Sequence, residues 1–281
     1  MYWQTSRRRL ELDRTLVMGV LNVTPDSFSD GGEFISCEAA LGRAERLIQD
    51  GADLIDIGGE STRPGSRPVA VDEEIRRVLP VIKEVAKRFD IPISVDTNKS
   101  EIARAAIDAG AEIINDVSGL RWDERIAELT AIIGAGLVLM HSRGTFEELH
   151  NQEPVDDIVA EVESSFSSSL SVARRYGIAD EQIILDVGIG FGKTFGQNLE
   201  LLAKLDSIVN KFGRYPVMVG VSRKSFVGRL LGDVPVSERL GGSIAAAIIA
   251  VINGANLLRV HDVKETVQAI KVASGILEMN G

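Results

Sequence analysis

Short apolar runs alternate with longer amphipathic stretches along this chain. Each run holds only a few residues and is rich in Val, Ile and Leu, which is typical of buried strands. The stretches between the runs repeat apolar residues every three to four positions, as in 75–86 and 199–209, and this spacing predicts helices. The predicted strands are 16–21, 54–57, 92–95, 113–117, 137–140, 183–186, 216–221 and 256–260. Glycines that lie where a predicted helix returns to a strand, and where a left-handed C-cap is expected, are Gly51, Gly110, Gly134, Gly177 and Gly254.

Eight strands that alternate with helices predict a parallel sheet in an α/β fold. The chain has 281 residues, so each strand–helix unit holds about 35 residues, the size found in a closed (β/α)8 barrel. An open, doubly wound sheet usually has a glycine-rich turn after its first strand, whereas here the sequence NVTPD follows at 22–26. We therefore expect a single (β/α)8 TIM barrel over residues 1–281, with residues 1–14 as a flap on the barrel floor.

Composition and charge exclude several classes of protein. Apolar residues make up 44% of the chain, which excludes disorder, and the single cysteine, Cys37, excludes a disulfide scaffold. The net charge of −10 has the wrong sign for a protein that coats nucleic acid or an anionic membrane. The longest strongly apolar run, 244–252, is too short to span a bilayer, and the arginines at 7–9 precede no secretory signal. We therefore expect a cytoplasmic protein that binds neither nucleic acid nor membrane.

Polar residues follow every one of the predicted strands. Barrel enzymes place their chemistry at the C-terminal ends of the strands. A helix N-cap would explain any one of these residues, but it does not explain all of them together. We therefore expect the active site at this end of the barrel. The strand-end residues are Asn22, the segment 60–63, Asp96, Asn115, His141, Asp186, the segment 222–224, Arg259 and His261.

Two long loops follow the first two strands. The loops 26–33 (DSFSDGGE) and 58–69 (GGESTRPGSRPV) combine glycines, hydroxyls and arginines. This composition suits a mobile lid that closes on an anionic ligand. A GxGxG pattern at 188–192 follows the sixth strand, so it is poor evidence for a dinucleotide site.

Two long segments of the chain, 18–32 (MGVLNVTPDSFSDGG) and 56–65 (DIGGESTRPG), have distinctive sequences. They are similar to the signatures of the dihydropteroate synthase family. Shorter matches follow at 94–97 (SVDT), 114–119 (INDVSG), 222–226 (SRKSF) and 259–263 (RVHDV). The chain departs from the family at Val187, where proline is usual. The resemblance implies a transferase of folate biosynthesis that condenses 6-hydroxymethyl-7,8-dihydropterin pyrophosphate with p-aminobenzoate and releases pyrophosphate and 7,8-dihydropteroate.

The resemblance also implies a pterin site. A pterin is a flat ring with N–H donors and a carbonyl oxygen on one edge, so it needs a carboxylate acceptor and a donor. Asp186 is expected to accept from the ring, and Lys224 is expected to donate to the carbonyl oxygen or a ring nitrogen. The implied pterin-binding residues are Asp96, Asn115, Val117, Met140, Asp186, Phe191 and Lys224.

The remaining groups of the implied reaction are pyrophosphate and a metal ion. The implied pyrophosphate ligands are Asn22, Thr62, Arg63, Arg259 and His261. Mg²⁺ is the implied cofactor, and Asn22 is its implied ligand, because Mg²⁺ bound to phosphate oxygens takes few protein ligands. The family's reaction is a dissociative substitution that needs charge stabilisation more than a strong base. The implied catalytic residues are Asp96, Lys224 and Arg63.

The implied p-aminobenzoate site lies between the two long loops. It is expected to use Phe28, Pro64 and Ser225. Because part of this pocket belongs to the loops, we expect p-aminobenzoate to bind well only after the pterin or its pyrophosphate. Sulfonamides, which copy the aniline and the anionic end of p-aminobenzoate, are expected to compete with it.

Two other functions compete with this interpretation. A methyltetrahydrofolate:corrinoid methyltransferase would share the pterin edge, but it would have no use for the pyrophosphate ligands. A non-catalytic paralogue that binds pterin is the second alternative, and it should lack part of the loop or phosphate set. We also expect a homodimer, with the helices at 243–252 and 263–277 as a candidate face.

Overall fold

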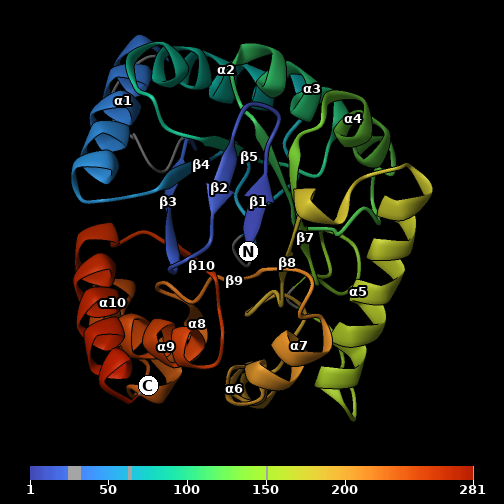
Figure 1. Cartoon of the computed structure of the whole chain (residues 1–281). Coiled ribbons are helices and arrows are strands. Elements are labelled where there is room, and N and C mark those ends of the chain that lie inside the picture. Colours follow the sequence, from blue (N-terminus) through green and yellow to red (C-terminus); the bar gives the residue numbers. More distant parts are fainter. Residues whose placement is uncertain (25–32, 63–64, 150, 281) are drawn as a thin grey trace.

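A computed structural model describes residues 1–24, 33–62, 65–149 and 151–280 of the chain. Its centre is a closed barrel of parallel strands in the order β10-β3-β4-β5-β6-β7-β8-β9 (Figure 1). The prediction of a (β/α)8 barrel is therefore confirmed. The barrel strands are β3 (Leu16–Asn22), β4 (Leu54–Gly58), β5 (Ile93–Asp96), β6 (Ile113–Asp116), β7 (Gly136–Met140), β8 (Ile183–Asp186), β9 (Val217–Val219) and β10 (Leu257–Val260).

Helices surround the barrel and connect its strands (Figure 1). The periodic stretch 199–209 forms two helices rather than one, because the chain changes direction at Lys204, which ends the first helix and caps the second. The five glycines at the helix ends all have the expected positive φ. The helices are α1 (Glu33–Gln49), α2 (Val71–Arg88), α3 (Ser100–Ala109), α4 (Arg125–Ile133), α5 (Ile158–Arg175), α6 (Phe195–Ala203), α7 (Leu205–Lys211), α8 (Ser225–Leu230), α9 (Leu240–Ile252) and α10 (Val263–Leu277).

The helix α2 shows why the periodic stretches fold as helices. Its buried side chains include Val78, Val81, Ile82 and Val85, which recur every three to four residues and pack on the barrel. Acidic residues occupy its first turn and basic residues its last, which suits the helix dipole. Between the strands and the helices lies the larger hydrophobic core.

A hairpin of β1 (Tyr2–Gln4) and β2 (Arg9–Glu11) covers the end of the barrel at which the strands begin, and it crosses the strands in Figure 1. Trp3 is fully buried against the apolar residues that fill the barrel interior. Its indole Nε1 donates to the carbonyl oxygen of Gln182 at 2.8 Å, so this large side chain also satisfies its one polar group.

The opposite end of the barrel brings the polar strand ends together. Parallel pairing places Asn22 beside Gly58, Gly58 beside Asp96, and Asp96 beside Asn115. Residues that are far apart in the sequence therefore form one row around the barrel mouth. None of the helices in the described ranges is long and apolar enough to cross a membrane.

Candidate active site at the barrel mouth

Arg259 on β10 joins two carboxylates across the barrel. Its Nε donates to Oδ2 of Asp56 on β4 at 2.6 Å, and its Nη2 donates to Oδ2 of Asp96 on β5 at 2.6 Å. Asn115 on β6 donates through Nδ2 to the same Asp56 oxygen at 3.1 Å. Because these groups are buried or nearly so, the ion pairs are less screened by water than surface pairs. The cluster holds three of the residues implied from the sequence in one place.

Burial also shifts the pKa values of Asp96 and Arg259. Burial raises the pKa of Asp96 to about 7; Arg259 opposes this shift, and the Asp56 carboxylate adds to it. The pKa of Arg259 is raised: burial alone would lower it, but the Asp56 and Asp96 carboxylates outweigh that effect. The arginine therefore stays charged, while Asp96 can change its protonation state near neutral pH.

A second group of implied residues lies where β8 and β9 end. Asp186 is buried, and its Oδ1 accepts from the backbone N–H of Gly188 at 2.8 Å. Lys224 donates through Nζ to the carbonyl oxygen of Ile189 and lies 4.3 Å from the centre of the Phe191 ring. Burial lowers the pKa of Lys224 to about 8, and the Asp186 carboxylate opposes this shift. Burial raises the pKa of Asp186, whereas its hydrogen bond from Gly188 and the charge of Lys224 lower it.

Serine and histidine side chains extend the mouth beyond β9 and β10. The Oγ of Ser222 lies 3.2 Å from Nδ1 of His261 and accepts from the His261 backbone N–H at 3.2 Å. Arg43 on α1 donates to the His261 carbonyl oxygen at 2.7 Å. These contacts therefore join the segment after β10 to the segment after β9 and to α1.

The other implied residues differ in burial, and some of them lie outside the described residues. Val117 and Met140 are buried at the ends of β6 and β7, and Asn22 and Thr62 are half-buried near the ends of β3 and β4. Ser225 is exposed and begins α8. Three implied residues, Phe28, Arg63 and Pro64, lie outside the described part of the chain.

Asp56 is a site residue that the sequence reasoning missed. It lies inside the apolar strand LIDIG of β4, and it is completely buried. A charge within an apolar run needs a buried partner, and this signal was present in the sequence. The identity of that partner was not, because Arg259 follows 203 residues later.

A network of charges at the base of the loop after β4 was also missed. Lys99 donates through Nζ to Glu60 at 2.8 Å, to Glu74 at 2.6 Å and to the carbonyl oxygen of Val69 at 2.8 Å. Glu60 in turn accepts from the Val69 backbone N–H at 2.6 Å. The two ends of the segment 60–69 are therefore fastened to each other and to α2.

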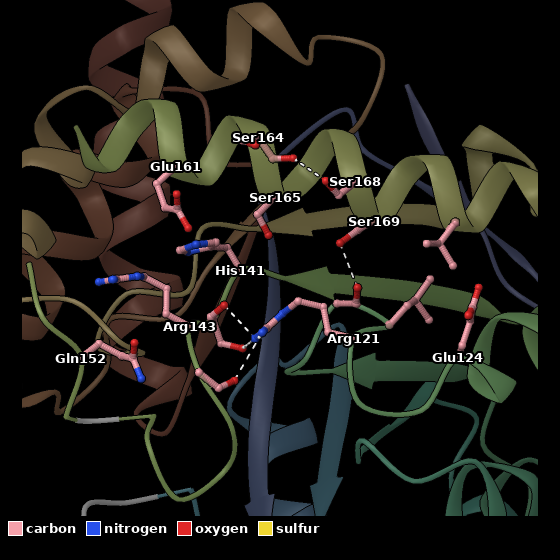
Figure 2. Close-up of a pocket in the computed structure, with 15 residues that line it drawn as sticks. Arg121, Glu124, His141, Arg143, Gln152, Glu161, Ser164, Ser165, Ser168 and Ser169 are labelled. Carbon is pink, nitrogen blue, oxygen red and sulfur yellow. Dashed lines mark hydrogen bonds between the residues drawn. The ribbon is translucent and has the colours of Figure 1, made fainter. Parts of the chain in front are cut away.

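His141, a strand-end residue to which the family resemblance gave no role, lies in a cavity of about 430 Å³ beside the barrel (Figure 2). The cavity is bounded by α5 and by the loops that follow β6 and β7. Both ring nitrogens of His141 lack a partner among the described residues, and burial lowers its pKa to about 2, with Lys193, Arg121 and Arg143 adding to the shift. The imidazole is therefore neutral. Arg121 crosses the cavity edge and donates to the Ser142 carbonyl oxygen and hydroxyl at 2.8 Å each.

Comparison with known proteins identifies the family. Residues 18–261 match the family model of pterin binding enzymes. The dihydropteroate synthase of Synechocystis sp. is 45% identical to this chain over 263 residues, which cover 94% of this chain and 90% of the relative. The enzyme of the same name from Escherichia coli strain K12 is 46% identical over 268 residues, which cover 95% and 94% of the two chains.

Solved structures agree with the sequence matches. A dihydropteroate synthase from Xanthomonas albilineans, solved with 4-aminobenzoic acid, has a TM-score of 0.92 and 44% identity and covers 99% of each chain. A dihydropteroate synthase from Yersinia pestis, solved with a sulfonamide drug complex, has a TM-score of 0.92 and 42% identity and covers 99% of this chain and 100% of that one. Sequence, fold and the charged barrel mouth lead to one conclusion: this chain belongs to the dihydropteroate synthase family of pterin-binding enzymes.

Proposed function

We propose that the barrel mouth of this chain condenses 6-hydroxymethyl-7,8-dihydropterin pyrophosphate with p-aminobenzoate. The observation that supports this most directly is the convergence of Arg259, Asp96 and Asp56 beside Asp186 and Lys224. Such a set offers acceptors for the N–H groups of a pterin and cations for its anionic leaving group. Family membership favours this reaction over the methyl transfer considered from the sequence.

Asp186 and Lys224 orient the pterin ring. One Asp186 oxygen is used by the Gly188 N–H, while the other has no partner among the described residues and can accept from the pterin. Lys224 donates to the ring carbonyl oxygen or a ring nitrogen, and Phe191 covers one ring face with Val117 and Met140 as further apolar walls. Asp96 and Asn115 complete the polar edge.

Arg259 and His261 meet the pyrophosphate together with Asn22, Thr62 and Arg63. Arg259 donates two of its N–H groups to Asp56 and Asp96, and a guanidinium has five N–H groups in all. Its remaining donors can therefore face the leaving group while the carboxylates hold its plane in position. This arrangement lowers the entropy lost when the guanidinium meets the anion.

The residues present fit a magnesium ion that is held mainly by the substrate. Asn22 offers a neutral oxygen at the end of β3, and the described residues contain no cluster of three or more His, Cys, Asp or Glu side chains that could hold a metal. A hard ion that takes few ligands from the protein suits such a sparse site, and Asn22 would hold it there. When bound, Mg²⁺ would supply charge stabilisation to the departing pyrophosphate.

The bond between the pterin methylene carbon and the pyrophosphate oxygen breaks first, and its electron pair leaves with the pyrophosphate. The positive charge left on the methylene group spreads into the electron-rich reduced pterin. Asp96, when ionised, and the neighbouring dipoles favour this cation, while Arg259 and Arg63 favour the anion. The amine of p-aminobenzoate then forms a bond to the methylene carbon and releases a proton to water. In this scheme the p-aminobenzoate site is formed by Ser225, Phe28 and Pro64.

The chain forms a homodimer through the outer faces of α9 and α10. These helices pack side by side (Figure 1), and their exposed apolar residues include Ile249, Ile252, Val272 and Ile276. Exposed apolar residues on two adjacent helices are typical of a protein interface. We also place the enzyme in the cytoplasm. Its single cysteine, Cys37, cannot form a disulfide within the chain, which suits a reducing compartment.

The test of this function is a reconstituted reaction with purified protein. Product formation should require the pterin pyrophosphate, p-aminobenzoate and Mg²⁺ together. Lys224→Gln should lower kcat/KM by about tenfold or more, because it removes a charged hydrogen-bond donor from a buried site, whereas Lys211→Gln on the surface of α7 should leave it unchanged. Titration of p-aminobenzoate should show tighter binding when pterin and pyrophosphate are present. A protein that binds the pterin but forms no product under these conditions would support the non-catalytic alternative.

A further inference from the structure

Three backbone carbonyl oxygens converge on the side chain of Lys193. Its Nζ donates to the carbonyl oxygens of Gly188 at 2.8 Å and Phe191 at 2.9 Å, both in the loop between β8 and α6. It also donates to the carbonyl oxygen of His141, the residue that follows β7, at 3.3 Å. An ammonium group has three N–H donors and no acceptor. All three donors are therefore used, and two neighbouring loops are joined at one point.

The backbones of the two loops lie so close together that no side chain fits between them at two glycines. Gly188 has a φ of +65°, and a Cβ at this position would overlap the His141 carbonyl oxygen. Gly192 has a φ of +66°, and a Cβ there would lie 2.7 Å from Cβ of Arg143. Carbonyl dipoles that point at one spot repel each other unless a cation lies between them. Burial lowers the pKa of Lys193 well below that of a free lysine, and Asp186 opposes this shift. The three carbonyl oxygens nevertheless require the charged form, because only an ammonium group has a donor for each of them.

The loop that Lys193 joins to His141 contacts two residues of the proposed pterin site, Asp186 and Lys224. The carbonyl oxygen of Ile189 accepts from Lys224, and the ring of Phe191 lies beneath the same ammonium group, 4.3 Å from it. The Gly188 N–H donates to Asp186 at 2.8 Å. A shift of this loop would therefore move the partners of both Asp186 and Lys224.

We propose that Lys193 is a positioning residue whose ammonium serves as a built-in monovalent cation and fixes the loop 187–192 for pterin binding. This inference rests on the proposed role of Asp186, Phe191 and Lys224 in that binding. Backbone carbonyl oxygens coordinate K⁺ in the same manner in proteins that bind it. A guanidinium directs its donors outward in a planar fork, so arginine has the charge of Lys193 but cannot meet three oxygens around one point.

The first experiment separates charge, geometry and packing. Lys193→Met keeps the aliphatic stem without the charge, and Lys193→Arg keeps the charge without the point geometry. The matched control is Lys204→Met, which removes an exposed lysine from the end of α6, where it pairs with Glu200. The dissociation constant of 6-hydroxymethyl-7,8-dihydropterin pyrophosphate is measured by calorimetry, and the fold is checked by circular dichroism. Both Lys193 variants should bind the pterin tenfold or more weakly, and the control should match the parent.

The second experiment supplies the cation from solution. Lys193→Ala leaves space for a small ion among the three carbonyl oxygens, so pterin binding by this variant is measured in ammonium, potassium and tetramethylammonium chloride at equal ionic strength. Ammonium or potassium should restore affinity severalfold, while tetramethylammonium, which is too large for the site, should not. The parent should bind equally in all three salts. A residue that only fills space would show no such selective rescue.

The outcomes distinguish this inference from the proposed function. A parent enzyme that does not bind the pterin contradicts the proposed function itself. A parent that binds, with a folded Lys193→Met variant that binds within twofold of it, overturns the role of Lys193 alone. Weak binding by Lys193→Ala that neither ammonium nor potassium improves also overturns it. If Lys193→Met does not fold, Lys193→Ala is refolded in the three salts, and equal recovery in all of them counts against the proposal.

Discussion

Arg259 and Asp56 lie 203 residues apart in the chain, yet Nε of the arginine is 2.6 Å from Oδ2 of the aspartate inside the barrel. The pair links β10 to β4, which are not neighbours in the sheet. Asp96 shares the same guanidinium. The closed barrel therefore fixes the position of this arginine through contacts with two strands that are distant from it in the sequence.

Removing the carboxylate of Asp56 should destabilise the fold. Asp56→Ala leaves Arg259 with one partner fewer and takes an acceptor from Asn115, in a site where Asp56 is fully buried. Breaking a buried ion pair from one side costs about 3–5 kcal/mol in the free energy of unfolding. Urea denaturation followed by circular dichroism measures the change. Glu84→Gln, which breaks an exposed pair with Arg88 on α2, should cost less than about 1 kcal/mol; equal effects would show that the buried pair contributes nothing special.

Asp186→Asn should abolish detectable pterin binding while the protein stays folded. The Asn side-chain oxygen can still accept from the Gly188 N–H, as Asp186 does now, so the loop keeps its contact. The other atom becomes an N–H donor that faces the donors of the pterin. Unpaired donors in a buried site cost on the order of 1–3 kcal/mol each. Calorimetric titration with the pterin substrate checks this, and an unchanged affinity would remove Asp186 from the site.

Asn22→Ala should uncouple turnover from magnesium. The variant should bind a pterin without the pyrophosphate as the parent does, because Asn22 is assigned to the metal and not to the ring. Its binding of pyrophosphate should lose the dependence on Mg²⁺ that a hard ion with few protein ligands confers. Titration of pyrophosphate at several magnesium concentrations measures this. A variant that responds to magnesium as the parent does would show that other groups hold the ion.

The protonation of Asp96 should make stability depend on pH. Burial, the main cause, raises the pKa of Asp96 from 3.8 to about 7, so between about pH 4 and pH 7 the folded state binds a proton that the unfolded state releases. The contribution of Asp96 is fully present below pH 4 and is lost as the pH rises through about 7. Asp96→Asn cannot titrate, so its stability relative to the parent should rise across this window by on the order of 4 kcal/mol, since each pKa unit corresponds to about 1.4 kcal/mol.

Urea titrations at four or five pH values measure this difference between Asp96→Asn and the parent. Asp90→Asn is the control, since the Asp90 side chain is almost fully exposed, and its difference from the parent should stay flat. A flat difference for Asp96→Asn as well would mean that Asp96 is ionised throughout the window.

A charge on the outer face of α9 or α10 should split the dimer. Ile249 and Val272 are 49% and 64% exposed, so Ile249→Glu and Val272→Glu disturb no core packing, but they would bury an unpaired carboxylate at the proposed interface. Light scattering should give twice the 30.4 kDa chain mass for the parent and one chain mass for the variants. Ile132→Glu is the control, because Ile132 is 68% exposed on α4. A parent that is monomeric at micromolar concentration would contradict the proposal.

The sequence by itself determined the order and type of the elements. All eight predicted strands recur in the barrel within one or two residues of their predicted ends, and Gly110, like the other four glycines, has the left-handed φ that its helix end requires. These features depend on local chemistry: the periodicity of burial, the restriction of φ, and the preference of polar residues for strand ends. The alignment of Asp96 and Asn115 at one edge also follows, because parallel strands end on the same side.

Only the tertiary structure decided which side chains meet. Asp56 meets Arg259 from a strand 203 residues away, and Lys193, besides two carbonyl oxygens of its own loop, meets the carbonyl oxygen of His141 in a different βα unit. The break between α6 and α7 at Lys204 was likewise not visible in the sequence pattern, since the apolar periodicity runs through it. Periodicity reports that a residue is buried, but the closure and stagger of the strands set which buried groups face each other. For that reason the sequence could propose Asp96, Asn115 and Arg259 as neighbours at the barrel mouth, whereas the folded barrel determined how they are connected and brought Asp56 among them.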